Sequence, residues 1–235
     1  MKQRTANQKE LELQEQPTTA GVIVLGGGVV GCSVAYHLAK LGADVLLLER
    51  DRLTSGTTWH AAGLLSEFRG TRALTELARY SVSLYEKLTE ETGQATGLKR
   101  NGSIAIATDQ DRWGELRRGA TVARSLGIEA EEATSRDVAQ LWPLAQTDDL
   151  VGAIYYPNDG QINPVDVTMA LAKGARLFGA RLMEKTPVIG VVQQDGQVRG
   201  VETSVGYIAS EIIVNCAGMW ARELGQASGV NVPLH

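Results

Sequence analysis

The sequence predicts an α/β fold built on a parallel β-sheet. Residues 21–25 and 43–48 are short runs of β-branched and aliphatic side chains, the composition of strands that are buried on both faces. Residues 29–41 lie between them and carry apolar side chains at helical spacing, and Gly42 is suited to end that helix. A strand, a helix and a strand in this order form a βαβ unit, the building block of a parallel sheet.

The middle of the chain is expected to be an insertion into this sheet domain. Residues 71–92 form a long amphipathic stretch that ends at Gly93, which predicts a helix with a broad apolar face. A strand at residues 102–108 is predicted to precede a helix at 110–126, and a shorter helix follows at 134–141.

The last third of the chain is predicted to return to the sheet domain. Asn163-Pro164 opens a helix that runs to about residue 178, because proline is well suited to a first helical turn. Two β-rich runs, 188–194 and 197–203, flank Asp195-Gly196, which is a strong signal for a hairpin with a type I′ turn. A buried strand and a helix follow, at residues 211–216 and 221–228.

Composition excludes several classes of protein. The chain has 235 residues, of which 43% are hydrophobic, enough for a sizeable core. Its 23 basic and 27 acidic residues give a net charge of −4 without a long basic run, so nucleic acid is not an expected partner. No apolar stretch approaches the roughly 18 residues of a membrane span, so no membrane association is expected. The two cysteines, Cys32 and Cys216, lack metal-ligand spacing and are expected to be buried thiols in a reducing compartment, first the cytoplasm and second the mitochondrial matrix.

A glycine motif between the first strand and the first helix predicts a dinucleotide site. Gly26, Gly28 and Gly31 form the pattern G-x-G-x-x-G, and Glu49 ends the second strand. In such a motif the glycines allow a tight turn, close approach of the pyrophosphate and helix packing, while the helix N-terminus holds the phosphates. The acid is then expected to accept hydrogen bonds from the ribose hydroxyls. The sequence therefore predicts a Rossmann-like domain, and the glycines alone leave NAD and FAD open.

The loop after Glu49 favours FAD. Residues 53–64 are mostly small and hydroxylic and contain one Trp59-His60 pair. Such a loop offers N–H and O–H donors to a pyrophosphate and lets backbone run close to a planar ring.

At these residues the chain resembles the dimethylglycine and sarcosine dehydrogenase family, FAD-dependent amine oxidoreductases whose loop reads T-W-H-A-A-G-L or closely similar. Residues 100–103, 163–166 and 214–220 support the resemblance, which covers the chain from about residue 21. It implies oxidation of the N-methyl group of a small N-methylated amino acid by hydride transfer to FAD, with His60 as the covalent anchor of the flavin. Tetrahydrofolate and an electron-transfer flavoprotein are further implied partners. No catalytic base or metal ligand can be named from the sequence.

The resemblance also implies a domain organisation and a set of cofactor-binding residues. The family's members are longer, so the substrate domain is expected to be incomplete at the C-terminus. The expected segments are a disordered tail at 1–20, an FAD-binding domain at 21–93 and 151–235, and part of an α+β substrate domain at 94–150. The residues placed around FAD are Gly26, Gly28, Val29, Val30, Gly31, Glu49, Arg50, Gly56, Thr57, Thr58, Trp59, His60, Ala61, Ala62, Gly63, Leu64, Val188 and Trp220.

Three other functions compete with this one. The chain also resembles the regulatory subunit of pyruvate dehydrogenase phosphatase, a non-enzymatic relative without the T-W-H loop, so Thr58-Trp59-His60 favours the oxidoreductase. Glycine oxidase and glycerol-3-phosphate dehydrogenase share the glycine pattern but not the Trp-His loop. A nicotinamide dehydrogenase leaves that loop unexplained.

Overall fold

The computed structural model of the protein describes residues 17–234 and divides into two compact units. The first unit combines the chain up to residue 60 with the chain from residue 171, and the second comprises residues 61–170. These bounds differ from the expected segments 21–93, 94–150 and 151–235. The assignment of one part to the cofactor and another to the substrate stays a prediction.

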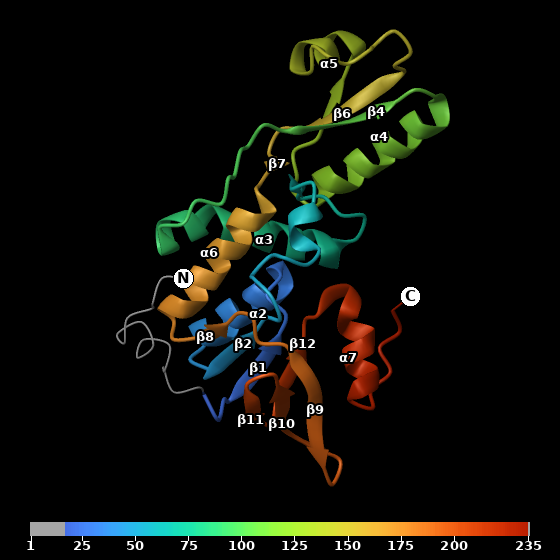
Figure 1. Ribbon diagram of the computed structural model, residues 1–235. Helices are drawn as coiled ribbons and strands as arrows, with labels where there is room; N and C mark the ends of the chain where they lie inside the picture. Colours follow the sequence, from blue (N-terminus) through green and yellow to red (C-terminus); the bar gives the residue numbers. More distant parts are fainter. Residues whose placement is uncertain (1–16, 235) are drawn as a thin grey trace, which may run out of the picture. The chain divides into compact units, whose positions relative to one another are not determined.

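A parallel sheet is the centre of the first unit (Figure 1), and it confirms the predicted βαβ unit. Strands β1 (Val22–Leu25) and β2 (Val45–Leu48) lie side by side, joined through helix α2 (Val29–Lys40). The later strands β8 (Arg181–Met183) and β12 (Ile213–Asn215) extend the sheet at its two edges, in the order β12-β1-β2-β8. All four residues of β2 are buried, which explains its unbroken aliphatic sequence.

A three-stranded antiparallel sheet belongs to the same unit. It consists of β9 (Val188–Gln194), β10 (Gln197–Thr203) and β11 (Gly206–Ala209). The predicted hairpin turn is correct, because Asp195 and Gly196 have φ values of 54° and 74°, the positive sign that a type I′ turn requires at both positions. The third strand, β11, was not predicted. Helix α7 (Ala221–Ala227) follows a short 3₁₀ turn, η2 (Gly218–Trp220).

Residues 17–20, the described part of the expected tail 1–20, contact the sheet domain. Thr19 pairs with Ala209 at the end of β11, and the Ala20 amide donates to the Ala209 carbonyl at 3.0 Å. Ala20 is buried in the core that contains Ile23 and Leu46. Residues 1–16 of the expected tail lie outside the described residues.

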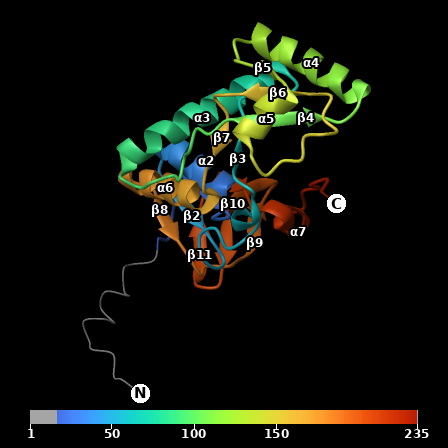
Figure 2. The same ribbon diagram turned by 90° about the horizontal axis from the view of Figure 1, so that it is seen from above.

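The second unit has a small sheet with one helix on each face (Figure 2). Its sheet order is β4-β6-β5, all antiparallel. Helix α4 packs on the face that carries Ile154 and Tyr156, and helix α5 packs on the face that carries Ala153 and Tyr155. The alternation of side chains along β6 separates these two cores. The bounds are β4 (Ser103–Ala107), α4 (Gln110–Ser125), β5 (Glu131–Ala133), α5 (Ser135–Leu141) and β6 (Gly152–Tyr156).

Two helices and a strand pair complete the fold. Helix α3 (Arg72–Thr92) ends at Gly93 in the left-handed conformation, as the sequence predicts. Helix α6 (Pro164–Leu177) begins at the predicted proline, and the side-chain oxygen of Asn163 accepts from the Val165 and Asp166 amides at its start. The pair β3 (Leu64–Leu65) and β7 (Gly160–Gln161) is antiparallel and was not predicted.

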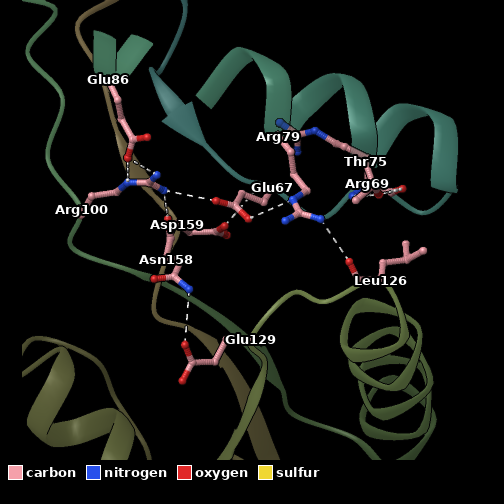
Figure 3. A network of polar contacts seen from close by, with 10 residues as sticks. All are labelled: Glu67, Arg69, Thr75, Arg79, Glu86, Arg100, Leu126, Glu129, Asn158 and Asp159. Carbon is pink, nitrogen blue, oxygen red and sulfur yellow. Dashed lines mark hydrogen bonds and ion pairs between the residues drawn. The ribbon is translucent and has the colours of Figure 1, made fainter. Parts of the chain in front are cut away.

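A polar network in the second unit is organised around one buried carboxylate (Figure 3). Asp159, only 2% exposed, accepts from the Glu67 amide at 3.0 Å and from the Ser103 hydroxyl at 2.6 Å. Arg100 pairs with Glu67 and with Glu86 of α3, and donates to the Asn158 carbonyl. Asp159 therefore fixes the loop before α3 to the start of β4.

Replacing this carboxylate should destabilise the protein. Asp159→Ala leaves the Glu67 amide and the Ser103 hydroxyl without their acceptor, so we expect the free energy of unfolding to fall by about 2–3 kcal/mol. Urea denaturation followed by circular dichroism measures the change. Asp148→Ala, at an exposed position, is the control and should stay within about 0.5 kcal/mol of the parent. Equal stability of the two variants would contradict the structural role of Asp159.

Candidate cofactor site

A cavity of about 390 Å³ lies in the first unit where the strands of the parallel sheet end. Gly26, Glu49 and Cys216 directly follow β1, β2 and β12, and all three line it. Ligands of open α/β sheets bind at this carboxyl edge. The sheet therefore brings the glycine motif and Glu49 together with residues from the far end of the sequence.

The three glycines of the motif have different physical roles. Gly26 has a φ of +112°, and a Cβ there would lie 2.4 Å from the Cys216 carbonyl oxygen. A Cβ on Gly31 would lie 1.9 Å from the Gly26 carbonyl oxygen, so this glycine lets the helix approach the turn. Gly28 has an ordinary φ of −81°, and a Cβ there would meet only the Thr58 hydroxyl, at 3.0 Å. Gly26 and Gly31 are needed by the backbone, whereas Gly28 keeps the cavity open.

The N-terminus of α2 opens onto this cavity and suits an anion. The first turn of a helix has N–H groups without an intrahelical acceptor, and they carry a partial positive charge. The first turn of α2 contains no acidic residue, and Gly28 offers no capping side chain. The Val29 amide donates to the Thr58 hydroxyl oxygen at 3.0 Å. The geometry fits a pyrophosphate at this helix end.

Glu49 is held in place by two backbone amides. It is 9% exposed, and its carboxylate accepts from the Gly27 amide at 2.6 Å and from the Asp51 amide at 2.9 Å. A carboxylate has about four acceptor sites, so further acceptor capacity remains for hydroxyl donors in the cavity. This arrangement fits the predicted contact with ribose hydroxyls.

A cation–π pair and two aliphatic side chains form other parts of the cavity lining. The guanidinium carbon of Arg50 lies 3.9 Å from the centroid of the Trp220 ring, a cation–π contact. Val188 and Leu224 also line the cavity and pack on the same hydrophobic core. These side chains give one part of the cavity the character of a site for a planar ring.

His60 lies at the end of the loop that lines the cavity. Thr58, Trp59 and His60 form one 3₁₀ turn, η1 (Thr58–His60), and the His60 amide donates to the Thr57 carbonyl at 3.2 Å. The Trp59 and His60 rings contact each other in a tilted arrangement, with centroids 3.7 Å apart and planes inclined by 33°, and both side chains are exposed. His60 itself does not line the cavity.

Half of the residues expected around the cofactor line this cavity. They are Gly26, Gly28, Glu49, Arg50, Gly56, Thr57, Thr58, Val188 and Trp220. Val29, Val30, Gly31, Trp59 and His60 belong to the same unit but do not line it. Ala61, Ala62, Gly63 and Leu64 belong to the second unit. Contact of all these residues with FAD stays a prediction.

Several lining residues were not expected. Ala217 and Gly218 follow the predicted strand at residues 211–216, and the rule that ligands sit at carboxyl ends of parallel strands would have found them. Glu223, Leu224 and Ala227 come from α7, and Thr186 and Ile189 flank the start of β9. No sequence signal marks these five, because their exposure to the cavity depends on how α7 packs beside β9.

The comparison with known families decides the class of protein. The family model described as DAO, FAD dependent oxidoreductase, matches residues 21–235. The chain belongs to this family. The resemblance drawn from the T-W-H loop is confirmed at this level, and the cofactor of the family is FAD.

Curated relatives from several organisms match nearly the whole chain. The pyruvate dehydrogenase phosphatase regulatory subunit of Mus musculus is 44% identical over 93% of this chain and 25% of its own length. Sarcosine dehydrogenase of Homo sapiens is 43% identical over 93% of this chain and 24% of its own length. The chain thus spans about a quarter of the length of these relatives.

Solved structures share the fold. L-proline dehydrogenase from P. horikoshii is 28% identical with a TM-score of 0.86, over 91% of this chain and 57% of that chain. Glycine oxidase from Bacillus cereus is 31% identical with a TM-score of 0.78, over 88% of this chain and 57% of that chain. These matches confirm the FAD-binding α/β fold.

The two cysteines differ in their relation to the cavity. Burial raises the pKa of Cys32 to about 12, and its thiol lies 3.7 Å from the Gly27 carbonyl oxygen beneath the glycine turn. Burial also raises the pKa of Cys216, which lines the cavity. Both are free thiols, as expected, but only Cys32 is buried, whereas Cys216 is half-buried and the expectation of a buried thiol was wrong there. Within residues 17–234 no group of acidic, histidine and cysteine side chains could hold a metal ion, and no helix there could cross a membrane.

Substitution of the glycines should separate binding from folding. Gly28→Ala should lower the unfolding free energy by no more than about 1 kcal/mol, because the φ of Gly28 suits alanine and a Cβ there meets only the Thr58 hydroxyl. It should weaken ADP binding roughly 10-fold or more, about 1.4 kcal/mol, because the new methyl group meets Thr58 and enters the cavity. Gly31→Ala should instead destabilise the fold by about 1–3 kcal/mol or more. Calorimetric titration and urea denaturation measure the two effects, and the hypothesis fails when Gly28→Ala binds ADP like the parent.

Thiol labelling should distinguish the cysteines. The shift of the Cys32 pKa from 9.0 to about 12 lowers its thiolate fraction near pH 8 roughly a thousandfold. We therefore expect iodoacetamide to label Cys216 before Cys32 in the folded protein, and saturating ADP to slow labelling of Cys216. Peptide mass spectrometry after timed quenching measures both rates, with Cys216→Ser as the control. Faster labelling of Cys32 would mean that the glycine turn does not bury it.

Proposed function

We propose that the protein oxidises the N-methyl group of an N-methylated amino acid of the dimethylglycine or sarcosine type. FAD is the two-electron acceptor for this reaction, and His60 binds the flavin covalently. The observation that carries the proposal is the Thr58-Trp59-His60 turn, which starts at the cavity and ends in an exposed imidazole.

The names of the relatives support the substrate class. Sarcosine dehydrogenase, dimethylglycine dehydrogenase and 4-methylaminobutanoate oxidase (formaldehyde-forming) are 43%, 42% and 40% identical to this chain. Each of these names refers to an amine that carries an N-methyl group and a carboxylate. A substrate of that chemistry is therefore favoured over a primary amino acid, the substrate class in the name of glycine oxidase, which is 34% identical.

The chain's own residues supply cofactor binding in this proposal. The N-terminus of α2 holds the pyrophosphate, and Glu49 accepts from the ribose hydroxyls. Arg50 and Trp220 form a wall of the cavity. The exposed imidazole of His60 is the nucleophile that forms the covalent bond. Tetrahydrofolate, an electron-transfer flavoprotein and a cytoplasmic or matrix location remain predictions from the family resemblance.

A regulatory function is the second candidate. It is favoured by the 44% identity to the pyruvate dehydrogenase phosphatase regulatory subunit, one percentage point above the identity to sarcosine dehydrogenase. Overall identity does not separate the two functions. Flavin binding does, because the proposed oxidoreductase requires FAD as its electron acceptor.

The decisive experiment asks whether flavin survives denaturation. The purified chain is precipitated in acid and examined by intact mass and by flavin fluorescence on a denaturing gel. We expect the parent to retain FAD and His60→Ala to lose all covalent flavin. His37→Gln, on α2, is the matched control and should retain it. A parent without covalent flavin would contradict the proposed attachment, and one without any bound FAD would favour the regulatory function.

A further inference from the structure

A groove of about 380 Å³ lies in the second unit between helix α4 and strand β5, which Figure 2 shows side by side. Residues three or four positions apart on a helix share one face, and the α4 residues that line the groove follow this spacing. The lining residues are Gly114, Arg117, Arg118, Thr121 and Arg124 of α4 and Glu132 of β5. This arginine groove therefore gathers three guanidinium groups against one carboxylate, and within residues 17–234 it shares no lining residue with the cofactor cavity.

Two of the three arginines are fixed by contacts at the edge of the groove. The Arg117 side chain donates from Nε to the Glu132 carboxylate at 3.2 Å, and its guanidinium carbon lies 5.8 Å from the centroid of the Trp113 ring. The Arg124 side chain donates from Nη1 to the Ala130 carbonyl at 2.7 Å. A guanidinium has five N–H donors, so both groups keep donors for a ligand. Because these side chains are already held, a ligand that binds them loses less affinity to the cost of ordering them.

The third arginine, Arg118, has no partner in a hydrogen bond or ion pair within residues 17–234. Its guanidinium lies back along the helix, because a Cβ on Gly114 would be 3.3 Å from Arg118 Nη1. Glycine inside a helix is less stable than alanine, and Gly114 does not have the positive φ that would require glycine. The space that Gly114 leaves open is the space next to the Arg118 guanidinium in the groove.

The charges along α4 are not balanced as they are on an ordinary solvated helix. Arg112, outside the groove, pairs with Glu115 three positions later at 2.7 Å. Arg117 and Arg124 have no acidic residue three or four positions away, and the acid nearest to Arg118 on the helix is the already paired Glu115. Like charges that are gathered in one place repel one another, and a bound anion relieves this repulsion.

We infer that the arginine groove binds a small polyanion through Arg117, Arg118 and Arg124. The planar guanidinium forms paired hydrogen bonds with phosphate and carboxylate oxygens alike, and the volume of the groove is that of a small-molecule site. A single negative charge would leave most of the guanidinium charge uncompensated, so the ligand carries two or more. This site does not depend on the proposed function.

The inference is tested by calorimetric titration with pyrophosphate and with citrate at low ionic strength, with bound FAD left in place and unbound FAD removed. We expect Arg118→Gln and Arg124→Gln each to weaken binding at least about 10-fold, the effect of losing a hydrogen bond to a charged group. Arg112→Gln makes the same change of charge on the same helix outside the groove, and it should bind like the parent. Tighter binding of pyrophosphate would identify a phosphate ligand, and tighter binding of citrate a carboxylate ligand.

A second variant separates binding from folding. Gly114→Ala improves the helix propensity of α4 and places a methyl group against the Arg118 guanidinium. We expect it to weaken binding of the anion at an equal or higher melting temperature, which a loss of folding cannot produce. A parent that binds neither anion, or parent-like binding by both Arg118→Gln and Arg124→Gln, would overturn the inference. Equal weakening by Arg112→Gln would also overturn it, because the attraction would then belong to the whole helix and not to the groove.

Discussion

The close contact between Gly31 and the Gly26 carbonyl oxygen is the constraint on which the rest of the site depends. A Cβ on Gly31 would lie 1.9 Å from that oxygen, so only glycine lets α2 start directly above the turn. Gly26 in turn lies against the Cys216 carbonyl at the end of β12. The turn that lines the cavity therefore lies between the end of α2 and the end of a strand from the far end of the chain, and both contacts require glycine.

Electrostatics divide the cavity into two regions that match the two polar parts of a dinucleotide. The end of α2 lacks acidic residues in its first turn and favours an anion. Glu49, a buried carboxylate in the same cavity, is stabilised by the Gly27 and Asp51 amides and needs donors rather than anions. A bare phosphate would satisfy only the first region. A ligand that carries phosphates and ribose hydroxyls satisfies both, which is why the geometry fits FAD better than a simple anion.

Local signals in the sequence were sufficient for the elements that local chemistry determines. The Asp195-Gly196 turn, the Asn163-Pro164 helix start and the glycine motif each require particular residues, and each was predicted correctly.

Strands β6 and β8 were not predicted, because their formation depends on neighbouring strands. Residues 181–183 contain no β-branched side chain, and they are a strand because β2 offers an edge to pair with. Residues 152–156 form a strand because β4 and β5 pair with them on both sides. The lining residues of α7 were missed in the same way, since tertiary packing and not residue type exposes them.

The Trp59-His60 pair carries the functional argument because packing does not account for it. Both rings are exposed and contact each other, so they contribute little burial to the fold. The neighbouring Thr58, by contrast, is buried, hydrogen-bonded and part of the cavity lining. Trp59 and His60 follow it in the chain but do not line the cavity. A structural role would be expected to bury the aromatic rings and expose the hydroxyl. Here the Thr58 hydroxyl is buried and the His60 imidazole is exposed. This arrangement suits a loop whose imidazole reacts with a ligand. The identities of 43% to an oxidoreductase and 44% to a regulatory subunit do not separate the two functions, so the proposal of an oxidoreductase rests on this turn.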